Sequence, residues 1–268
     1  MDKKMTILDE IVEYKKLELA HRKEQLPIEK IWSDIEKMPE PRDFKSAISK
    51  PNRINLIAEI KKASPSAGEI VENFDVKEIA KQYEEANADA ISVLTETKYF
   101  QGDIFHIDLV RQVSELPILR KDFIVDEYQI YESRYFGADA VLLIAAILDI
   151  EKIKKFLKIV NDLNLSAIVE IHTEEELKIV LNTDAKIIGI NNRNLSDLTV
   201  DLNTTLNLRE KIPGDKIIIS ESGIKTKQDI EKLKRSGINA VLIGEYLMKS
   251  QDIKNTIVDL LLWGGFYG

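Results

Sequence analysis

The chain has 268 residues, of which 44% are hydrophobic and 31% are charged, a composition that excludes disordered and fibrous classes. With 46 acidic and 38 basic side chains, its formal net charge of -8 argues against nucleic acid and anionic membranes as partners. The sequence has no cysteine and three histidines, so disulfides and thiol nucleophiles are excluded, and no metal site is expected.

The N-terminal part of the chain predicts a helical extension. Apolar residues at three-to-four spacing indicate a helix over residues 5–26. A second short helix is expected over residues 28–38, between prolines at 27 and 39. The first residues form no apolar signal segment and no apolar run reaches the roughly 20 residues of a membrane span, so we expect a cytoplasmic protein.

From residue 54 onward, eight short β-branched runs alternate with amphipathic stretches. The runs are nearly continuous in apolar residues, as is typical of strands covered on both faces. Helical periodicity fills stretches between them, and Asn87, Gly137 and Gly237 each supply a turn after a helix. The expected strands cover residues 54–60, 90–94, 118–119, 140–144, 167–171, 187–190, 217–219 and 240–243.

Eight strand–helix units predict an α/β fold, a (β/α)8 TIM barrel. Residues 1–50 would form an N-terminal helical extension that covers the barrel mouth, and residues 51–268 the barrel, within a single domain overall. An open doubly wound sheet is the alternative, but the segment after the first strand, residues 61–66, lacks its glycine-rich dinucleotide loop.

Polar side chains gather where the expected strands end, which is where barrels carry out chemistry. Glu59 and Lys61 are two residues apart, so both point to one face of the first strand. One such ion pair is usually structural, but lysines and glutamates at five strand ends together predict an active site. The polar strand ends include Glu59, Lys61, Lys121, Glu170, Asn191, Arg193, Glu221 and Glu245.

The last two strand ends predict a phosphate site. Gly223 follows the seventh strand and Gly244 the eighth, and Ser222 lies beside the first of them. Barrels commonly bind phosphate at these two loops through backbone N–H groups and a helix N-terminus. The ligand is therefore expected to carry a phosphate monoester that binds at these loops.

Seven stretches, in one order along residues 5–248, resemble the indole-3-glycerol-phosphate synthase family of tryptophan biosynthesis. They are IAEIKKASPS at 57–66, LTE at 94–96 with KYFQG at 98–102, PILRKDFI at 117–124, VEIH at 169–172, GINNRNL at 189–195, SESGI at 220–224 and LIGE at 242–245. The resemblance implies a carboxy-lyase that acts on 1-(2-carboxyphenylamino)-1-deoxyribulose 5-phosphate. The ring carbon bearing the carboxylate attacks the C2 ketone, carbon dioxide leaves, and water is eliminated, without cofactor or metal.

The resemblance also implies catalytic roles that suit the residue types. Lys121 is expected to act as general acid at the ketone oxygen, with burial and nearby Lys61 lowering its pKa. Glu170 would be the general base of the dehydration, and Glu59 would fix Lys61. Lys61 would neutralise the carboxylate and help to protonate the leaving hydroxyl, so the division of the acid role between the lysines stays open.

The remaining expected site residues contact the substrate. Asn191 and Glu221 would hold sugar hydroxyls and developing charge, and Arg193 either binds the carboxylate or forms a structural pair. Phe100 and Phe123 would pack against the anthranilate ring, a role typical of aromatic side chains in pockets. Further expected substrate contacts are Leu142, Leu242, Ser64, Ser222, Gly223, Gly244 and Glu245, the last through its backbone with its side chain pointing away.

Some expectations concern residues outside this set. His172 is expected to point to the strand face opposite Glu170 and to be a weak catalytic candidate. The apolar tail at 260–268 would pack on the barrel or form an oligomer contact, so the protein is expected to be a monomer or weak homodimer. The alternatives in function are a Schiff-base aldolase, which borohydride would trap on Lys121, a sugar-phosphate isomerase, and a catalytically silent phosphate-binding barrel.

Overall fold

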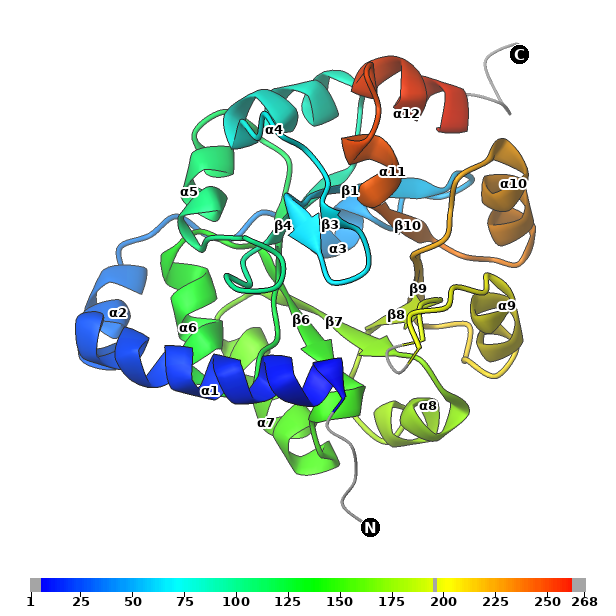
Figure 1. Cartoon of the computed structure of the whole chain (residues 1–268). Helices are drawn as coiled ribbons and strands as arrows, with labels where there is room; N and C mark the ends of the chain where they lie inside the picture. The colour runs from blue at the N-terminus through cyan, green and yellow to red at the C-terminus, as the bar shows by residue number, and fades with distance from the viewer. Residues whose placement is uncertain (1–5, 195–196, 262–268) are drawn as a thin grey trace.

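Eight parallel strands close into a barrel that helices surround on the outside (Figure 1). The computed structural model describes residues 6–194 and 197–261. β1 pairs with β10, Asn55 opposite Ala240, which confirms the (β/α)8 barrel and excludes the open sheet. The strands are β1 (Asn55–Ile60), β4 (Ala90–Leu94), β5 (Ile118–Lys121), β6 (Ala140–Ile144), β7 (Ser166–Ile171), β8 (Ile187–Asn191), β9 (Ile217–Glu221) and β10 (Ala240–Ile243).

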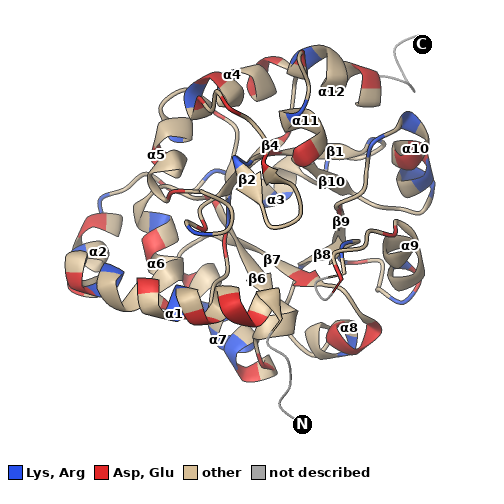
Figure 2. Ribbon diagram, in the orientation of Figure 1, with Lys and Arg blue, Asp and Glu red and all other residues tan. Residues whose placement is uncertain are grey.

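Several of the outer helices begin directly after a residue whose side chain caps the helix N-terminus. Asp75, Asp149, Thr173 and Thr226 each accept a hydrogen bond from a backbone N–H group of the first turn. Acidic and basic residues are intermixed along these helices (Figure 2). The helices are α4 (Val76–Glu85), α5 (Phe105–Arg111), α6 (Tyr128–Tyr135), α7 (Ile150–Asp162), α8 (Glu174–Val180), α9 (Asn203–Arg209), α10 (Lys227–Arg235), α11 (Glu245–Met248) and α12 (Ile253–Leu261), with a 3-10 turn η1 (Ala145–Ile147).

Successive strand side chains enter two different apolar layers. Ile57 and Leu119 belong to the cluster inside the barrel, whereas Ile60 and Val93 belong to the larger cluster between the strands and the helices. Both faces of each strand are therefore covered, which explains the continuous apolar runs in the sequence. A small hairpin, β2 (Ala63–Ser64) with β3 (Gly68–Glu69), follows β1.

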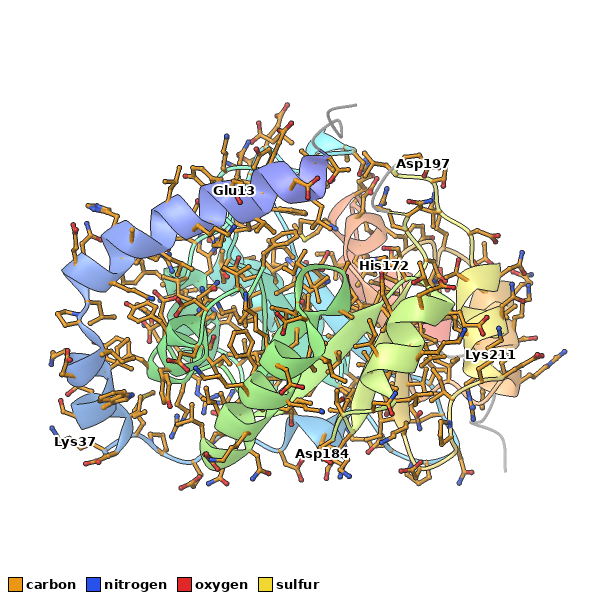
Figure 3. All side chains as sticks on the ribbon, turned by 90° about the horizontal axis from the view of Figure 1, so that it is seen from below. Glu13, Lys37, His172, Asp184, Asp197 and Lys211 are labelled. Carbon is orange, nitrogen blue, oxygen red and sulfur yellow. The ribbon has the colours of Figure 1, made fainter. Side chains whose placement is uncertain are left out.

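The first helix, α1 (Ile7–Gln25), runs along the end of the barrel at which the strands finish. Figure 3 shows α1, marked by Glu13, at the same end of the molecule as Asp197 in the loop after β8. A capping box between Thr6 and Asp9 starts this helix. Residues 1–5 of the expected extension lie outside the described residues.

The rest of the extension reaches the opposite end of the barrel. α2 (Ile28–Ile35) packs beside α6, and α3 (Phe44–Ala47) follows. Phe44 and Ile48 are buried in the interior cluster with alanines that begin three of the strands. The Asn55 Nδ2 atom donates to the Ile48 carbonyl at 3.1 Å and to the Asn239 carbonyl at 2.8 Å. Residues of α1 thus line the cavity at the carboxyl ends of the strands, and Phe44 of α3 packs among residues that begin the strands.

At the C-terminal end of the described chain, α12 packs against α4 and α10. Its Ile257 and Leu260 side chains are buried, as expected for packing on the barrel. The remainder of the apolar tail, residues 262–268, lies outside the described residues. Among the helices in the described ranges, none is both long enough and apolar enough to cross a membrane.

Candidate active site

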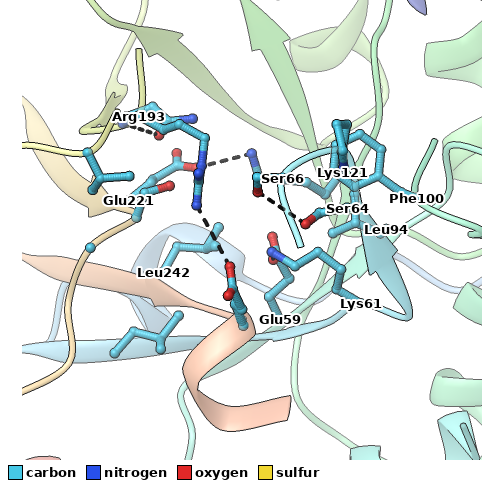
Figure 4. Close-up of a pocket in the computed structure, with 18 of the residues that line it drawn as sticks. Glu59, Lys61, Ser64, Ser66, Leu94, Phe100, Lys121, Arg193, Glu221 and Leu242 are labelled. Carbon is cyan, nitrogen blue, oxygen red and sulfur yellow. Dashed lines mark hydrogen bonds and ion pairs between the residues drawn. The ribbon is translucent and has the colours of Figure 1, made fainter. Parts of the chain in front are cut away.

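A cavity of about 810 Å³ opens at the carboxyl ends of the strands. Figure 4 shows Glu59, Lys61 and Lys121 around it, with Arg193 and Glu221 on the other side. The side chains at the strand ends converge because they continue the inward alternation of their strands, as Lys121 does two residues after Leu119. The expected site residues that line it are Glu59, Lys61, Ser64, Phe100, Lys121, Phe123, Leu142, Glu170, Asn191, Arg193, Glu221, Ser222, Gly223, Leu242, Gly244 and Glu245.

Lys121 lies between two buried carboxylates. Its Nζ atom is 3.0 Å from Glu170 Oε2 and 3.1 Å from Glu221 Oε2. Gly189 of β8 provides the space for this arrangement, because a Cβ atom there would overlap the Glu221 carboxylate. The three strand ends of β5, β7 and β9 therefore build one compact charged centre.

Lys61 and Glu59 form the second charged pair of the site. The Lys61 Nζ atom lies 2.6 Å from Glu59 Oε1, as expected for two residues on one face of β1. Gly244 gives this pair room, since a Cβ atom at this position would overlap the Glu59 carboxylate in its present position.

The pKa of Lys121 differs from the expectation. Burial alone would lower it, but the carboxylates of Glu170, Glu221 and Glu59 outweigh that effect and raise the pKa above the usual lysine value. The expected lowering by burial and Lys61 is therefore wrong, because the three nearby carboxylates outweigh the effect of burial. Lys121 is held as an ammonium ion.

The two carboxyl groups beside Lys121 differ from each other. Burial opposes ionisation of Glu170, but Lys121 and His172 outweigh it, so the pKa of Glu170 lies below its usual range. Burial raises the pKa of Glu221 to about 7, only partly offset by Lys121. The site thus holds one carboxylate kept ionised and one carboxyl group that titrates near neutral pH.

His172 does not point away from Glu170, as the sequence expectation had it. Its Nε2 atom lies 3.3 Å from Glu170 Oε1. Residues 170 and 172 are two apart, so strand alternation puts both on the same side, and correct use of that rule predicts the contact.

Two aromatic rings form one wall of the cavity. The ring centroids of Phe100 and Phe123 are 6.1 Å apart with a 40° tilt. The loop that carries Phe100 is fixed by the buried Glu96 carboxylate, which accepts hydrogen bonds from three successive backbone N–H groups, those of residues 98–100, at 2.7–3.1 Å. Leu142 and Leu242 of β6 and β10 also line the cavity.

The loops after β9 and β10 line the cavity where a phosphate site was expected. Ser222 and Gly223 both have positive φ angles, 68° and 82°, which turn the chain sharply after β9. The Glu245 carboxylate contacts Lys249 at 2.6 Å and Arg193 at 3.8 Å. Its hydrogen bond with Lys249 is the largest cause that keeps the pKa of Glu245 low.

Arg193 is engaged by protein groups. Its guanidinium donates to the Leu198 carbonyl at 3.2 Å in addition to the Glu245 contact, and its backbone N–H donates to Asn191 Oδ1 at 3.0 Å. Of the two expected roles, the geometry fits structural pairing, although the side chain still lines the cavity.

Helix α1 contributes residues that the sequence analysis did not name. Ile7, Leu8 and Ile11 line the cavity from its open side. On the same face, Lys15 is buried and its Nζ atom lies 2.9 Å from Asp122 Oδ1, the residue after Lys121. The sequence could have indicated this contact, because Lys15 follows Ile11 by four residues and so lies on the same face of the helix.

The arrangement as a whole suits an anionic substrate with an aromatic ring. It offers ammonium groups, an ionised carboxylate, an aromatic wall and two glycine loops in a single cavity. Among the described residues, no group of three or more histidine, aspartate or glutamate side chains is placed to hold a metal ion.

Comparisons with known proteins point to one family. The model of the indole-3-glycerol phosphate synthase family matches residues 8–260. The indole-3-glycerol phosphate synthase of Alkaliphilus metalliredigens is 47% identical over 95% of this chain and 97% of its own length. That of Clostridium acetobutylicum is 50% identical over 92% of this chain and 94% of its own length.

Solved structures support the fold alone. KGPDC from Streptococcus mutans has a TM-score of 0.61 at 12% identity and covers 78% of this chain and 96% of that chain. A 3-hexulose-6-phosphate synthase has a TM-score of 0.59 at 17% identity, covering 77% of this chain and 98% of that chain.

Proposed function

The chain belongs to the indole-3-glycerol phosphate synthase family, and from that membership we propose how its own side chains carry out the family's reaction. The reaction is a carboxy-lyase step of tryptophan biosynthesis. It closes a ring in 1-(2-carboxyphenylamino)-1-deoxyribulose 5-phosphate, releases carbon dioxide and eliminates water, leaving indole-3-glycerol phosphate.

Lys121 polarises the ketone in the ring closure. A group kept as an ammonium ion is suited to stabilise negative charge that develops on the carbonyl oxygen. The ring carbon that bears the carboxylate attacks C2, the C2 oxygen takes up a proton from the lysine, and the carbon–carboxylate bond then breaks to restore aromaticity. A Schiff-base aldolase needs a neutral amine instead, so the raised pKa of Lys121 speaks against that alternative.

Glu170 and Lys61 serve the dehydration. Glu170 is the general base, because it is ionised and lies at the same centre as Lys121. Lys61, aligned by Glu59, neutralises the substrate carboxylate and delivers a proton to the leaving hydroxyl group. The acid role is thus divided in sequence, Lys121 at closure and Lys61 at water loss.

The remaining residues hold the substrate. Phe100 and Phe123 stack along the anthranilate ring with Leu142 and Leu242 around it, and Asn191 and Glu221 bind sugar hydroxyl groups. The phosphate lies against the loops that carry Ser64, Ser222, Gly223, Gly244 and Glu245. We propose no nucleic-acid or membrane partner, a cytoplasmic location, and a monomer or weak homodimer.

The observation that carries this proposal is the position of Lys121 between Glu170 and Glu221 inside the aromatic-walled cavity. The test supplies the carboxyphenylamino-deoxyribulose phosphate and follows the rise of indole fluorescence. Lys121→Ala should lower kcat by about 100- to 10,000-fold, while affinity for a phosphate-bearing product analogue stays near the wild-type value.

Lys158→Ala is the matched control, because Lys158 is exposed on α7 and does not line the cavity, so kcat should stay unchanged. Near-full activity of Lys121→Ala would contradict the acid assignment. Covalent trapping of substrate on Lys121 by borohydride would favour the imine mechanism over the one proposed.

A further inference from the structure

The His172 imidazole lies between two carboxylates at the end of β7. Its Nε2 atom is 3.3 Å from Glu170 Oε1, and its Nδ1 atom is 3.3 Å from Glu176 Oε2. The side chain is only 8% exposed. His172 therefore connects Glu170 to the first turn of helix α8, away from the substrate cavity.

Glu176 fixes the ring in this position. The same Oε2 atom that contacts Nδ1 accepts a hydrogen bond from the backbone N–H of His172 at 2.6 Å. The Glu176 N–H in turn donates to the Thr173 hydroxyl, which caps α8. One carboxylate thus restrains both the backbone and the imidazole, as outer partners of functional histidines commonly do.

The charges around His172 favour its cationic form. Burial alone would lower the pKa of His172, but the hydrogen bond with Glu176 and the nearby charge of Glu170, with a smaller contribution from Glu221 of β9, raise it above the usual value. From the other strands, Lys121 of β5 and Asn191 of β8 face Glu170.

Each oxygen of Glu170 therefore lies near a different basic nitrogen, and the contact with His172 is one of charge, because the Nε2 atom forms no aligned hydrogen bond. Oε2 contacts Lys121 at 3.0 Å, and Oε1 contacts His172 at 3.3 Å. In the proposed reaction Lys121 turns its charge toward the ketone oxygen, so one of the two counter-ions of Glu170 is diverted to the substrate. His172, which is not among the cavity-lining residues, stays beside Glu170 throughout.

We propose that His172, oriented by Glu176, is a positioning residue that keeps the Glu170 carboxylate ionised and correctly aimed when Lys121 engages substrate. The inference rests on the proposed role of Glu170 as general base. It assigns to His172 and Glu176 a role in the reaction although neither touches substrate.

A direct test measures the titration of Glu170 by 13C NMR of its side-chain carboxyl, assigned with Glu170→Gln. In His172→Leu, which removes both the charge and the ring N–H, the pKa of Glu170 should rise by about one pH unit. His172→Gln keeps a polar side chain but removes the charge, and it should give a comparable rise, because the His172 Nε2 atom forms no aligned hydrogen bond with Glu170. Glu176→Gln should also give a small rise, because it weakens the cationic form of His172.

His21→Leu is the matched control, since the His21 side chain is 70% exposed on α1 and should leave Glu170 unchanged. Thermal unfolding of each variant shows that the comparison is made on folded protein. An unchanged Glu170 titration in folded His172→Leu overturns the proposal.

The pH profile of kcat/KM distinguishes this proposal from the assignment of the base. If Glu170 is the base, the acid limb of the profile that it sets moves to higher pH in His172→Leu. If the Glu170 titration shifts but no limb of the profile moves, the coupling between His172 and Glu170 holds and the general-base role of Glu170 fails.

Discussion

At the scale of single residues, the site holds three buried glutamates around two lysines, and each glutamate has a different environment. Glu170 has two cationic neighbours, Glu59 has Lys61 at 2.6 Å, and Glu221 shares Lys121 with Glu170. Neither oxygen of Glu221 has an aligned hydrogen-bond donor among the described residues. Glu221 is therefore the carboxyl group whose burial is least compensated, which accounts for its raised pKa.

Glu221 should therefore reduce the stability of the native protein at high pH. A carboxyl group whose pKa is raised from 4.5 to about 7 favours folding below pH 4.5, and this advantage is lost as the pH rises through 7. Gln resembles the protonated group at every pH. Glu221→Gln should raise the free energy of unfolding at pH 8 by the order of 1 kcal/mol and leave it nearly unchanged at pH 4.5, measured by urea denaturation.

The control for this prediction is Glu115→Gln, because the Glu115 side chain is 89% exposed. It should show no comparable difference between the two pH values. Equal effects of Glu221→Gln at pH 4.5 and pH 8 would mean that ionisation of Glu221 does not weaken the fold.

Strand alternation predicts much of the site from the sequence. The rule places Glu59 with Lys61 and brings the inward-facing strand ends together, as the structure has them. It does not predict the pKa of Lys121, because that depends on which carboxylates from β7 and β9 come within 3.1 Å of its Nζ atom. Such distances follow from the closure of the barrel and not from spacing along one strand.

At the scale of elements, the loop after β4 is a rigid support for the aromatic wall. Glu96 accepts the backbone N–H groups of Lys98, Tyr99 and Phe100, and its carbonyl accepts that of Gly102 at 2.8 Å. A Cβ atom at Gly102 would overlap the carbonyls of Leu94 and Glu96, so this turn needs glycine. The loop therefore presents Phe100 in one fixed orientation.

Replacing Glu96 by Gln should loosen this loop. The amide has one acceptor oxygen instead of two, and its NH2 group meets a backbone donor, so at least one of the three charge-assisted hydrogen bonds is lost. We expect KM to rise by about tenfold, which corresponds to about 1.4 kcal/mol of binding, with a smaller effect on kcat. Steady-state kinetics by indole fluorescence measures both values.

Glu85→Gln is a suitable comparison, because Glu85 is exposed at the end of α4. It should leave KM unchanged. A loss of kcat with unchanged KM in Glu96→Gln would show that the loop does not serve ring binding.

Helix ends and helix faces differ in how far sequence predicts them. Capping residues such as Asp149 and Thr226 mark helix starts in the sequence, and the structure uses both. The position of the short helix α3 cannot be predicted in this way, because four residues are too few to show a helical periodicity. The residues against which Phe44 packs come from several strands and are brought together only when the barrel closes. The extension was therefore predicted to cover the mouth but not to close the opposite end.

At the scale of the whole molecule, the net charge of -8 describes the outer surface and not the cavity. Acidic and basic residues are intermixed over the outer helices (Figure 2), whereas Lys61, Lys121 and Arg193 face one cavity. The glutamates that balance these cations are buried beside them. A protein that is acidic overall can thus present an environment fit for a phosphate and a carboxylate.

The two ends of the barrel divide stability from catalysis, as is general for this fold. Phe44 at the closed end is fully buried in the interior cluster, whereas Ile11 of α1 is buried at the edge of the substrate cavity. A substitution at each end therefore separates the two properties.

Phe44→Ala should lower the free energy of unfolding by about 3–5 kcal/mol, because the cavity it leaves lies inside a closed ring of strands that cannot collapse into it. At 25 °C the variant that remains folded should keep kcat and KM close to the wild-type values, since the cavity residues lie at the opposite strand ends. Ile11→Ala should cost less stability, about 2 kcal/mol, because it opens toward the substrate cavity, and it should raise KM severalfold. Urea denaturation and steady-state kinetics on the same preparations test both. A large kinetic defect in folded Phe44→Ala would mean that the packing of Phe44 at this end of the barrel shapes the active site as well as the fold.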